Sequence, residues 1–434
     1  MGFGEIFKAI SDPVRREILM LLKSGSMSAG DISNKFDMTA ATVSYHLSQL
    51  KRAGLLAESR VKNFIYYEIN PEVTKELAKW ISQFSPDDGD PVGQPILNLA
   101  DPDVLGAFLL EKGIVRDGEE YTARYCGGGV SCTVCFVSAA GGEYILKQGL
   151  ERLKVAETWL CDPNRMDAEQ QANRIYHELV PDCAPQVYGY DPDNYIYWRE
   201  AVPDSWRMWK SDLLAGKLDF AAADKVIRAM LKIHSECARR DDVRERFADK
   251  NIFYYLRVSP YIEFILKKYP ELEEYARPLI RALMDSSITL VHGDFSPKNI
   301  MTDGNGVSIL DFEVAHYGHP AFDLAFFSNH FILKAIKNRQ WAPSYMNMLD
   351  CMIGTYFSGV DYMDKAELES VYVKVLMLLM IARVDGKSPV EYLTDEADKD
   401  LVRRCARAVI SDGTGSFERA AGIIKKMIRS DHHD

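Results

Sequence analysis

The 434-residue sequence has no apolar run long enough to cross a bilayer. Its densest apolar stretch, residues 375–382, is short enough to be a buried helix. The first residues, MGFGEIFKAISDP, also lack the basic-then-apolar pattern of a signal peptide. We therefore expect a cytoplasmic protein without a membrane partner. A hydrophobic content of 47% with 26% charged residues is typical of a soluble globular chain, and the length predicts more than one domain.

Cysteine is scarce, and none of the eight cysteines occurs before Cys126. In a cytoplasmic chain of this size we expect free thiols. Cys132 and Cys135 form a C-x-x-C, a spacing found in redox and metal sites. No second pair of Cys or His lies near enough in the sequence to complete a tetrahedral site, so we interpret this pair as incidental.

Basic residues are outnumbered except at the N-terminus. Residues 1–84 hold 11 Lys and Arg against 9 Asp and Glu, a balance of +2. The remainder holds 41 against 54, a balance of −13. An acidic domain repels nucleic acid, so any DNA contact must belong to the N-terminal segment.

A turn-rich segment separates these two parts. Residues 85–95 read SPDDGDPVGQP, with three prolines, two glycines and no apolar periodicity. We place a linker over residues 85–99, after a first domain of residues 1–84. Residues 100–434 then form the larger part of the chain.

The first domain shows signals for several short helices. Asp12 before Pro13 is a cap followed by a helix-starting proline, and that helix should stop near Gly25. Ser28 can cap a second short helix that ends near Phe36, with Asp31 in the acidic capping-box position. A third helix is predicted over residues 40–53, stopped by Gly54.

The third helix has one apolar face and one polar face. Val43, Leu47 and Leu50 recur at helical spacing and should face the core. The opposite face is small and polar around Tyr45 and Ser48, which suits close approach to another molecule. Taken alone, this is a solvated helix. Residues 55–70, LLAESRVKNFIYYEIN, then predict a β-hairpin with a basic tip.

Helix, turn, helix and basic hairpin form the order of a winged helix-turn-helix. FKAISDPVRREILMLLKSG, TAATVSYHLSQLKRAGLL and FIYYEIN resemble the ArsR-type repressor family, in particular its metal-independent autorepressor branch. The family's metal sensors carry cysteines on the helix before the recognition helix; here that helix reads AGDISNKF and has none. The resemblance implies a homodimer on double-stranded operator DNA.

The resemblance also implies roles for individual residues. DNA contacts are expected at Thr42, Ser44, Tyr45 and Ser48 on the third helix, and at Arg60 and Lys62 in the wing. The dimer interface is expected at Phe3, Ile6, Phe7, Leu77, Trp80, Ile81 and Phe84, which lie at helical spacing in two segments.

A second motif occurs in the larger part. ITLVHGDF, at residues 288–295, and VSILDF, at residues 307–312, are apolar runs that lead into an aspartate. Phosphoryl transfer explains this spacing, because it needs a carboxylate at the attacking hydroxyl and oxygen ligands for magnesium. Asp294 suits the first role, and Asn299 and Asp311 suit the second.

This H-G-D-x-x-x-x-N and I-L-D-F-E pattern resembles the catalytic loop of aminoglycoside phosphotransferases, choline kinases and methylthioribose kinases. The resemblance implies a multidomain α+β chain that ends in a bilobal, protein-kinase-like phosphotransferase. The nucleotide-binding lobe would span residues 100–202 and a mostly helical lobe residues 203–434. Glu313 would be a further acidic group at the metal, and Asp323 would brace the catalytic loop.

The nucleotide lobe is expected around YCGGGVSCTVCFV, at residues 125–137. A triple glycine is by itself more often a hairpin turn, but EYILK follows at the distance found in kinases. The family often has Asn where this chain has Cys132. ATP contacts are expected at Gly127, Gly128, Gly129, Ser131, Lys147, Glu169, Glu200 and Val202.

These features predict a DNA-binding regulator fused to an ATP- and Mg²⁺-dependent kinase that acts on a hydroxyl of a small molecule. The alternative is a transcription factor whose kinase-like domain is a silent ligand sensor. An acidic domain suits a cationic acceptor such as an amino sugar, although acidic net charge is common among cytoplasmic enzymes. Because both modules share one chain, we also hypothesise that occupancy of the kinase shifts DNA affinity.

Overall fold

The computed structural model describes residues 3–10, 12–23, 25–36, 40–61, 64–82, 97–127, 132–150 and 163–431. The chain divides into two compact units, Met1–Gln94 and Pro95–Asp434. Each unit has hydrophobic clusters of its own. None of the helices in the described ranges has both the length and the apolar character needed to cross a bilayer.

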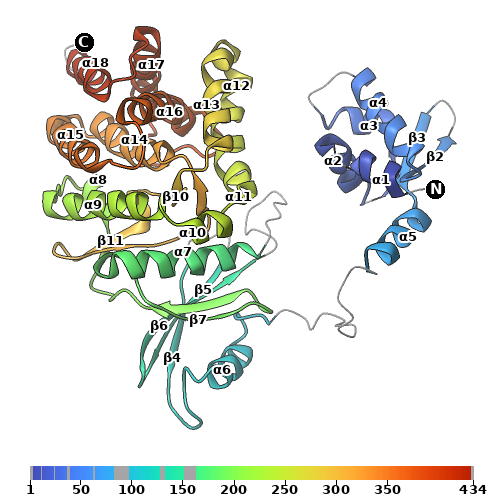
Figure 1. The fold of residues 1–434 in the computed structure, drawn as a ribbon, viewed down its shortest axis with the longest axis horizontal. Helices are drawn as coiled ribbons and strands as arrows, with labels where there is room; N and C mark the ends of the chain where they lie inside the picture. Colours follow the sequence, from blue (N-terminus) through green and yellow to red (C-terminus); the bar gives the residue numbers. More distant parts are fainter. Residues whose placement is uncertain are drawn as a thin grey trace. The chain divides into compact units, whose positions relative to one another are not determined.

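The first unit consists of short helices and a small sheet (Figure 1). Its elements are α1 (Phe3–Ile10), α2 (Pro13–Leu22), β1 (Met27–Ser28), α3 (Ala29–Ser33), α4 (Ala40–Arg52), β2 (Leu56–Val61), β3 (Phe64–Ile69) and α5 (Pro71–Ser82). The strands are antiparallel in the order β1-β3-β2, and β2 and β3 form the predicted hairpin. The unit therefore has the element order of a winged helix.

Local sequence signals explain where these helices begin and end. The Asp12 side chain accepts from the Arg15 N–H at 3.1 Å, and Ser28 Oγ accepts from the Asp31 N–H at 3.1 Å, so both predicted N-caps are confirmed. Gly54, with a φ of +75°, follows α4 as its C′ residue. The second helix is shorter than predicted, because α3 ends at Ser33 and only turn follows to Phe36.

The second unit begins with an antiparallel sheet of five strands in the order β4-β5-β6-β8-β7. Helices α6 (Pro102–Glu111) and α7 (Arg165–Leu179) accompany it, and Figure 1 shows α7 between the sheet and the helical part. The strands are β4 (Thr122–Tyr125), β5 (Cys132–Ala139), β6 (Gly142–Gly149), β7 (Val187–Asp191) and β8 (Ile196–Glu200). The sheet and α7 correspond to the smaller lobe of a kinase-like fold.

The rest of the second unit is mostly helical and holds the largest core. Two small antiparallel sheets, β10-β13 and β12-β11-β9, lie within it. Its elements are η1 (Pro181–Cys183), β9 (Arg207–Met208), α8 (Trp209–Leu214), α9 (Phe220–Cys237), α10 (Asp241–Arg246), α11 (Asn251–Phe253), the π-helical η2 (Tyr254–Glu263), α12 (Phe264–Lys268), η3 (Pro270–Leu272), α13 (Glu273–Asp285), β10 (Thr289–Val291), η4 (Pro297–Asn299), β11 (Ile300–Thr302), β12 (Val307–Ile309), β13 (His316–Gly318), α14 (Ala321–Lys337), η5 (Arg339–Trp341), α15 (Ala342–Gly359), α16 (Lys365–Asp385), α17 (Glu396–Asp412) and α18 (Phe417–Ser430).

Candidate active site and nucleic-acid interface

The H-G-D segment follows β10 directly and is buried. Gly293 has a φ of +75°, and a Cβ at this position would lie 2.6 Å from the Val314 carbonyl oxygen. Only glycine fits there, because the backbone is left-handed and the space is already taken. This turn places the side chain of Asp294 at the end of the buried strand.

The Asp294 carboxylate has one crowded oxygen and one unpaired oxygen. Its Oδ2 lies 3.1 Å from Arg257 Nη2 and 2.9 Å from Lys298 Nζ. The same oxygen accepts from Asn299 Nδ2 at 2.9 Å. Its Oδ1 is buried without a hydrogen-bond partner among the described residues. One carboxylate oxygen is thus held in place while the other is left to bind a ligand.

The charges around Asp294 keep it ionised. Burial raises the pKa of the Asp294 carboxyl, but Arg257 and Lys298 outweigh burial and hold that pKa below its ordinary value. Arg257 is itself fixed, because its Nε donates to the Gly293 carbonyl at 2.7 Å. A carboxylate that is ionised and immobile can accept the proton of an attacking hydroxyl.

Asp323 and His292 brace this loop. Asp323 is fully buried at the start of α14 and accepts from the N–H groups of His292, at 2.7 Å, and Gly293, at 2.9 Å. The His292 ring accepts from the Asp294 N–H at 3.2 Å and lies 3.2 Å from the Leu310 carbonyl. Burial lowers the pKa of His292, so the ring is neutral and donates its one N–H to Leu310. The predicted bracing contacts of Asp323 are confirmed.

Asp311, the second aspartate, lies in a strained turn after β12. It is one of two non-glycine residues in the described ranges with positive φ, at +70°. The Leu310 N–H, one residue earlier, donates to the Asn299 carbonyl at 2.8 Å. This bond ties the two proposed metal ligands to adjoining loops. The left-handed conformation costs about 1 kcal/mol and is typical of functional positions.

Lys147 joins the two lobes at this point. Its Nζ, from β6, lies 2.6 Å from Glu169 Oε1 of α7 and 2.6 Å from Asp311 Oδ1. Glu169 is fully buried and also accepts from the Tyr197 hydroxyl at 2.9 Å. The structure therefore brings together the lysine, glutamate and aspartate that the sequence placed in three separate motifs.

Electrostatics keeps Lys147 and Asp311 charged. Burial acts to lower the pKa of Lys147, but Asp311 and Glu169 raise it well above its ordinary value. Burial also acts to raise the pKa of Asp311, and Lys147 outweighs burial and leaves that pKa far below its ordinary value. The pKa of Glu169 is raised by burial, and Lys147 opposes the rise.

Glu313, the further acidic residue of the motif, faces a different group. Its Oε2 lies 3.4 Å from Nε of Arg165, a buried residue of α7. Ligand atoms of Glu313, Cys132 and Glu169 lie within 4.8 Å of one another, the spacing of a metal site. Burial raises the pKa of Cys132 to about 12, so it is a thiol at neutral pH rather than the thiolate that metals require.

The remaining nucleotide residues are only partly described. Gly127 follows β4, and a Cβ there would meet nothing within 4 Å. Gly128, Gly129 and Ser131 lie outside the described residues. Glu200 ends β8 and is exposed, and Val202 is half-buried just beyond it.

In the first unit, the predicted DNA-contacting residues of α4 are all exposed. Tyr45 is 58% exposed, while Val43 and Leu47 on the opposite face are buried. Arg60 of β2 is exposed, and Lys62 lies outside the described residues. The exposed residues of the predicted contact face are Thr42, Ser44, Tyr45 and Ser48.

The expected dimer interface needs one correction. Ile6 is 3% exposed and belongs to the hydrophobic core of its own unit, so it offers no surface to a partner. Its apolar spacing in the sequence reflects internal packing. Phe7 is 38% exposed, and Leu77 packs partly against the same core. The side chains of Phe3, Trp80, Ile81 and Phe84 lie outside the described set.

Comparison with known families agrees with both units. Residues 12–58 match the family described as "Bacterial regulatory protein, arsR family", and residues 122–342 match the "Phosphotransferase enzyme family". The chain belongs to the phosphotransferase enzyme family and begins with an arsR-family domain. It is therefore an ArsR-type DNA-binding regulator domain fused to a kinase-like phosphotransferase domain.

Individual relatives match one unit each. The arsR-family unit is 46% identical over 81 residues to the transcriptional repressor SdpR of Bacillus subtilis, which covers 19% of this chain and 90% of that protein. The phosphotransferase unit is 23% identical over 292 residues to the methylthioribose kinase of Bacillus pumilus, covering 60% of this chain and 72% of that one. A choline kinase structure from Cryptosporidium parvum aligns with a TM-score of 0.46 and 14% identity, covering 72% of this chain and 97% of that chain.

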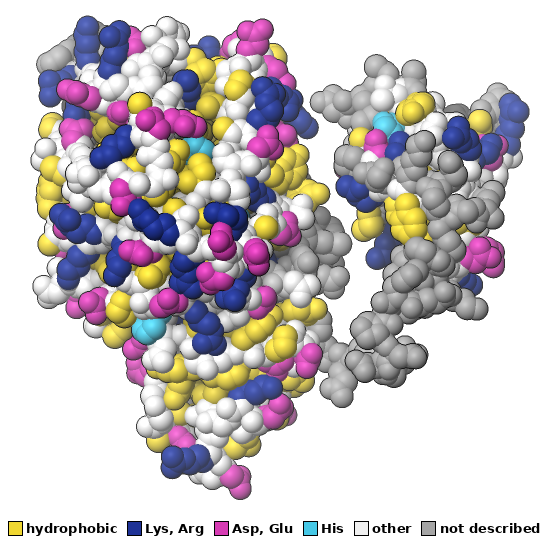
Figure 2. Space-filling model, in the orientation of Figure 1, with side chains coloured by type: hydrophobic (Ala, Val, Ile, Leu, Met, Phe, Trp, Pro, Cys, Tyr) yellow, Lys and Arg dark blue, Asp and Glu magenta, His cyan; other side chains and the backbone are white. Residues whose placement is uncertain are grey.

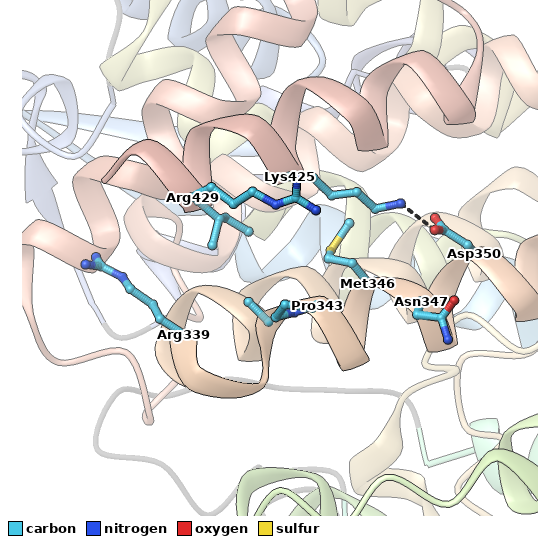
Figure 3. A pocket seen from close by; sticks show the side chains of 9 residues that line it. Arg339, Pro343, Met346, Asn347, Asp350, Lys425 and Arg429 are labelled. Atoms are coloured by element: carbon cyan, nitrogen blue, oxygen red, sulfur yellow. Dashed lines mark hydrogen bonds and ion pairs between the residues drawn. The ribbon is translucent and has the colours of Figure 1, made fainter. Parts of the chain in front are cut away.

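The phosphotransferase unit also has a pocket of about 480 Å³ between α15 and α18, away from the H-G-D loop (Figure 3). Lys425 in this pocket is paired with Asp350, as the dashed line shows. Arg339 is paired with Asp398 at 3.0 Å and with Asp431 at 2.9 Å. None of its lining residues belongs to the phosphotransfer group.

Sequence analysis missed two residues that shape the phosphotransferase site. Arg257 comes from the π-helical segment η2, where Pro260 lacks the N–H that a regular α-helical bond would need. Arg165 begins α7 and reaches Glu313. No local motif marks either arginine. A π-helical stretch is found frequently at functional sites, but it is visible only in three dimensions.

Proposed function

We propose that the second unit transfers the γ-phosphoryl group of ATP to a hydroxyl of a small molecule. One observation carries this proposal: Asp294, Asn299, Asp311 and Lys147 converge, and Asp294 keeps one buried oxygen without a partner. In the proposed reaction the acceptor hydroxyl oxygen attacks the γ-phosphorus, and the bond from that phosphorus to the ADP oxygen breaks. Asp294 takes the hydroxyl proton on its unpaired oxygen.

The donor set fits magnesium. Mg²⁺ prefers oxygen ligands, and Asp311 offers a carboxylate with 32% of its side chain exposed. The Asn299 amide nitrogen is turned to Asp294, which directs the amide oxygen away from it. We propose these two residues as ligands, with Glu313 as a further acidic group. The ion would neutralise charge on the β- and γ-phosphates.

Lys147 is proposed to bind the α- and β-phosphates of ATP. Glu169 orients it from the buried side at 2.6 Å, so the lysine head is held in one position before nucleotide arrives. Backbone N–H groups of residues 127–129, with Ser131, would contact phosphate, and Glu200 and Val202 lie where the adenine is expected. These remain proposals from the family resemblance.

The first unit is proposed to bind operator DNA as a homodimer. The exposed polar face of α4 would enter the major groove, with Arg60 and Lys62 on the flanking phosphates. Phe7 and α5 would supply apolar surface to the partner. We further propose that ligand occupancy of the phosphotransferase unit changes DNA affinity, which requires different ligand affinities in the two DNA-binding states.

One experiment tests the enzymatic part. The full chain is incubated with Mg²⁺ and ATP and with panels of hydroxylated compounds of anionic, neutral and cationic character. Phosphorylated product should form with the native chain and be lost in Asp294→Asn. Absence of product in every panel would favour the silent sensor. Gel shifts with and without nucleotide and acceptor test the coupling, and equal affinities would remove it.

A further inference from the structure

The region next to Asp294 contains more positive charge than its carboxylates can balance. We call six residues from five elements the cationic cluster. Two of them, Arg257 and Lys298, contact Asp294 directly. Glu391 is the second carboxylate of the region and pairs with a cluster member. The cluster consists of Lys210 of α8, Arg257 of η2, Lys298 of η4, His330 and Lys334 of α14, and Arg383 of α16.

Tyr261 links the catalytic loop to Arg383. Arg257 lies over the Tyr261 ring at 6.0 Å, and Arg383 lies over it at 5.5 Å. Arg383 Nη1 also donates to the Tyr261 hydroxyl at 3.1 Å. Burial raises the pKa of Tyr261, but the two guanidinium groups outweigh it and leave the pKa lowered. The field at this tyrosine is therefore positive.

Arg383 has no carboxylate partner among the described residues. It is 8% exposed, and its remaining bonds run to the Ser388 carbonyl and to the Ser388 hydroxyl at 3.4 Å. Its Nε is buried without a hydrogen-bond partner in the described chain. A buried guanidinium bound only to neutral groups is costly unless an anion completes it.

Lys334 is in the same condition. It is fully buried, its Nζ donates to the His330 carbonyl at 3.2 Å, and it lies 4.9 Å from the Tyr392 ring. Burial lowers the pKa of Lys334 to about 7, and Lys210 and Arg383 contribute to the shift. Glu391 acts against the shift but pairs with Lys210.

Unsatisfied atoms converge with these cations. Burial lowers the pKa of His330 well below its ordinary value, and Lys334, Arg383 and Lys298 add to the effect, so these groups lie close together. Buried polar atoms without a protein partner are the exception in folded proteins and are a mark of a binding site. Among the described residues such atoms include Asp294 Oδ1, His330 Nε2, Arg383 Nε and Tyr392 OH.

The pocket between α15 and α18 gives a contrast within the same unit. There Lys425 pairs with Asp350, and Arg339 pairs with two aspartates (Figure 3). Lys334 and Arg383 lack such partners in the described chain. Figure 2 shows Lys, Arg, Asp and Glu intermixed over the visible face of the larger unit, so its net negative charge is not gathered there. Net charge therefore does not report the charge beside Asp294.

We propose that the acceptor is an anionic hydroxylated compound, whose carboxylate or phosphate group binds Arg383 and Lys334 while its hydroxyl lies at Asp294. This assignment rests on the phosphotransferase function proposed above and replaces the cationic acceptor expected from net charge. An oxyanion between Arg383 and Lys334 compensates both cations and supplies acceptors for the Arg383 Nε and the Lys334 ammonium.

Binding of four sugars that share one ring tests the charge preference. D-Glucuronate carries a carboxylate, D-glucose 6-phosphate a phosphate, D-glucose no charge and D-glucosamine an ammonium. The full chain is titrated with each in the presence of Mg²⁺ and a non-hydrolysable ATP analogue. We expect at least one anionic sugar to bind about tenfold or more tightly than glucose and glucosamine. The two anionic arms decide between carboxylate and phosphate. Equal binding of all four, or preference for glucosamine, overturns the proposal.

Charge-removing variants locate the anion. Arg383→Gln and Lys334→Met should each weaken binding of the preferred anionic sugar about tenfold or more, without changing affinity for the ATP analogue. Arg419→Gln, an exposed arginine paired with Asp412, and Lys425→Met, the paired lysine of the other pocket, are the matched controls. Unchanged anion binding in Arg383→Gln and Lys334→Met overturns the proposal. Two variants are used so that misfolding of one leaves a result.

Failure of the enzymatic function is separable from failure of this inference. Anion binding is measured without turnover, and phosphorylation is measured with ATP and the three charge panels. Binding of anionic sugars without product in any panel supports the cationic site and rejects the kinase function. Product formed only from neutral or cationic compounds supports the kinase and overturns the anionic acceptor.

Discussion

The ammonium of Lys147 lies 2.6 Å from the carboxylate of Asp311, although the two residues are 164 positions apart in the sequence. The same ammonium contacts Glu169 at 2.6 Å. In the proposed reaction Lys147 binds nucleotide phosphates and Asp311 binds the metal, so this contact spans the two lobes where ATP would sit. Nucleotide and metal would therefore bind to groups that the protein has already aligned.

Replacing Lys147 by Met should abolish tight ATP binding and also destabilise the second unit. The variant leaves Glu169 fully buried without its cation, and breaking a buried pair costs about 3 kcal/mol. Lys147→Met with Glu169→Gln should recover much of this stability without recovering activity. Thermal unfolding and ATP titration measure the two effects. A double variant no more stable than Lys147→Met would contradict the pairing.

Asp294→Asn should lower the turnover number about 10²- to 10⁴-fold while leaving ATP affinity nearly unchanged. The amide keeps the shape of the side chain but cannot accept the hydroxyl proton. Steady-state kinetics with the best acceptor of the panels separates kcat from KM. Asp303→Asn, in an exposed turn of the same lobe, is the control and should behave as the native chain.

Arg257→Gln should move the acidic limb of the pH–rate profile to higher pH. Arg257 and Lys298 hold the pKa of Asp294 below its ordinary value against burial, so losing Arg257 raises that pKa. Asp294 then takes up its proton at a higher pH, and activity is lost earlier on acidification. The profile of kcat/KM measures this shift. An unchanged limb would show that Arg257 has only a structural part.

Lys334→Met should stabilise the second unit near pH 7. The pKa of Lys334 is about 7 in the folded protein and about 10.5 when unfolded, so the unfolded chain binds more protons between these values. The native chain therefore gains stability as pH rises from 7 to about 10.5, and the variant lacks this gain. We expect Tm about 2 °C or more higher in the variant at pH 7, with the difference shrinking toward pH 10. A constant difference would contradict the assigned charge.

Tyr45→Ala and Arg60→Gln should weaken operator binding in different ways. Removal of a base contact at Tyr45 should cost about 1–3 kcal/mol and relax sequence preference. Removal of a phosphate contact at Arg60 should lower the slope of affinity against salt by about 0.9 per contact. Gel shifts at several salt concentrations measure both. Lys75→Gln, an exposed lysine on α5, is the control, and an equal loss there would count against a specific interface.

Local features of the fold were predictable because they depend on neighbours in the sequence. The caps at Asp12 and Ser28, the stop at Gly54 and the buried face of α4 each follow from residues a few positions apart. The same holds for the spacing of Asp294 and Asn299 in one loop. Ile6 shows the limit, because an apolar residue at helical spacing does not reveal whether it packs internally or against a partner.

The sequence by itself determined the order of the elements, the two families and which carboxylates could perform phosphoryl transfer. Only the tertiary structure decided what surrounds those carboxylates: Arg257 and Arg383 approach from distant helices, and Lys334 is buried without a carboxylate partner in the described chain. The reason is physical. Net charge sums over all residues regardless of place, whereas the field at a buried site falls with distance and depends on which few charges are paired nearby.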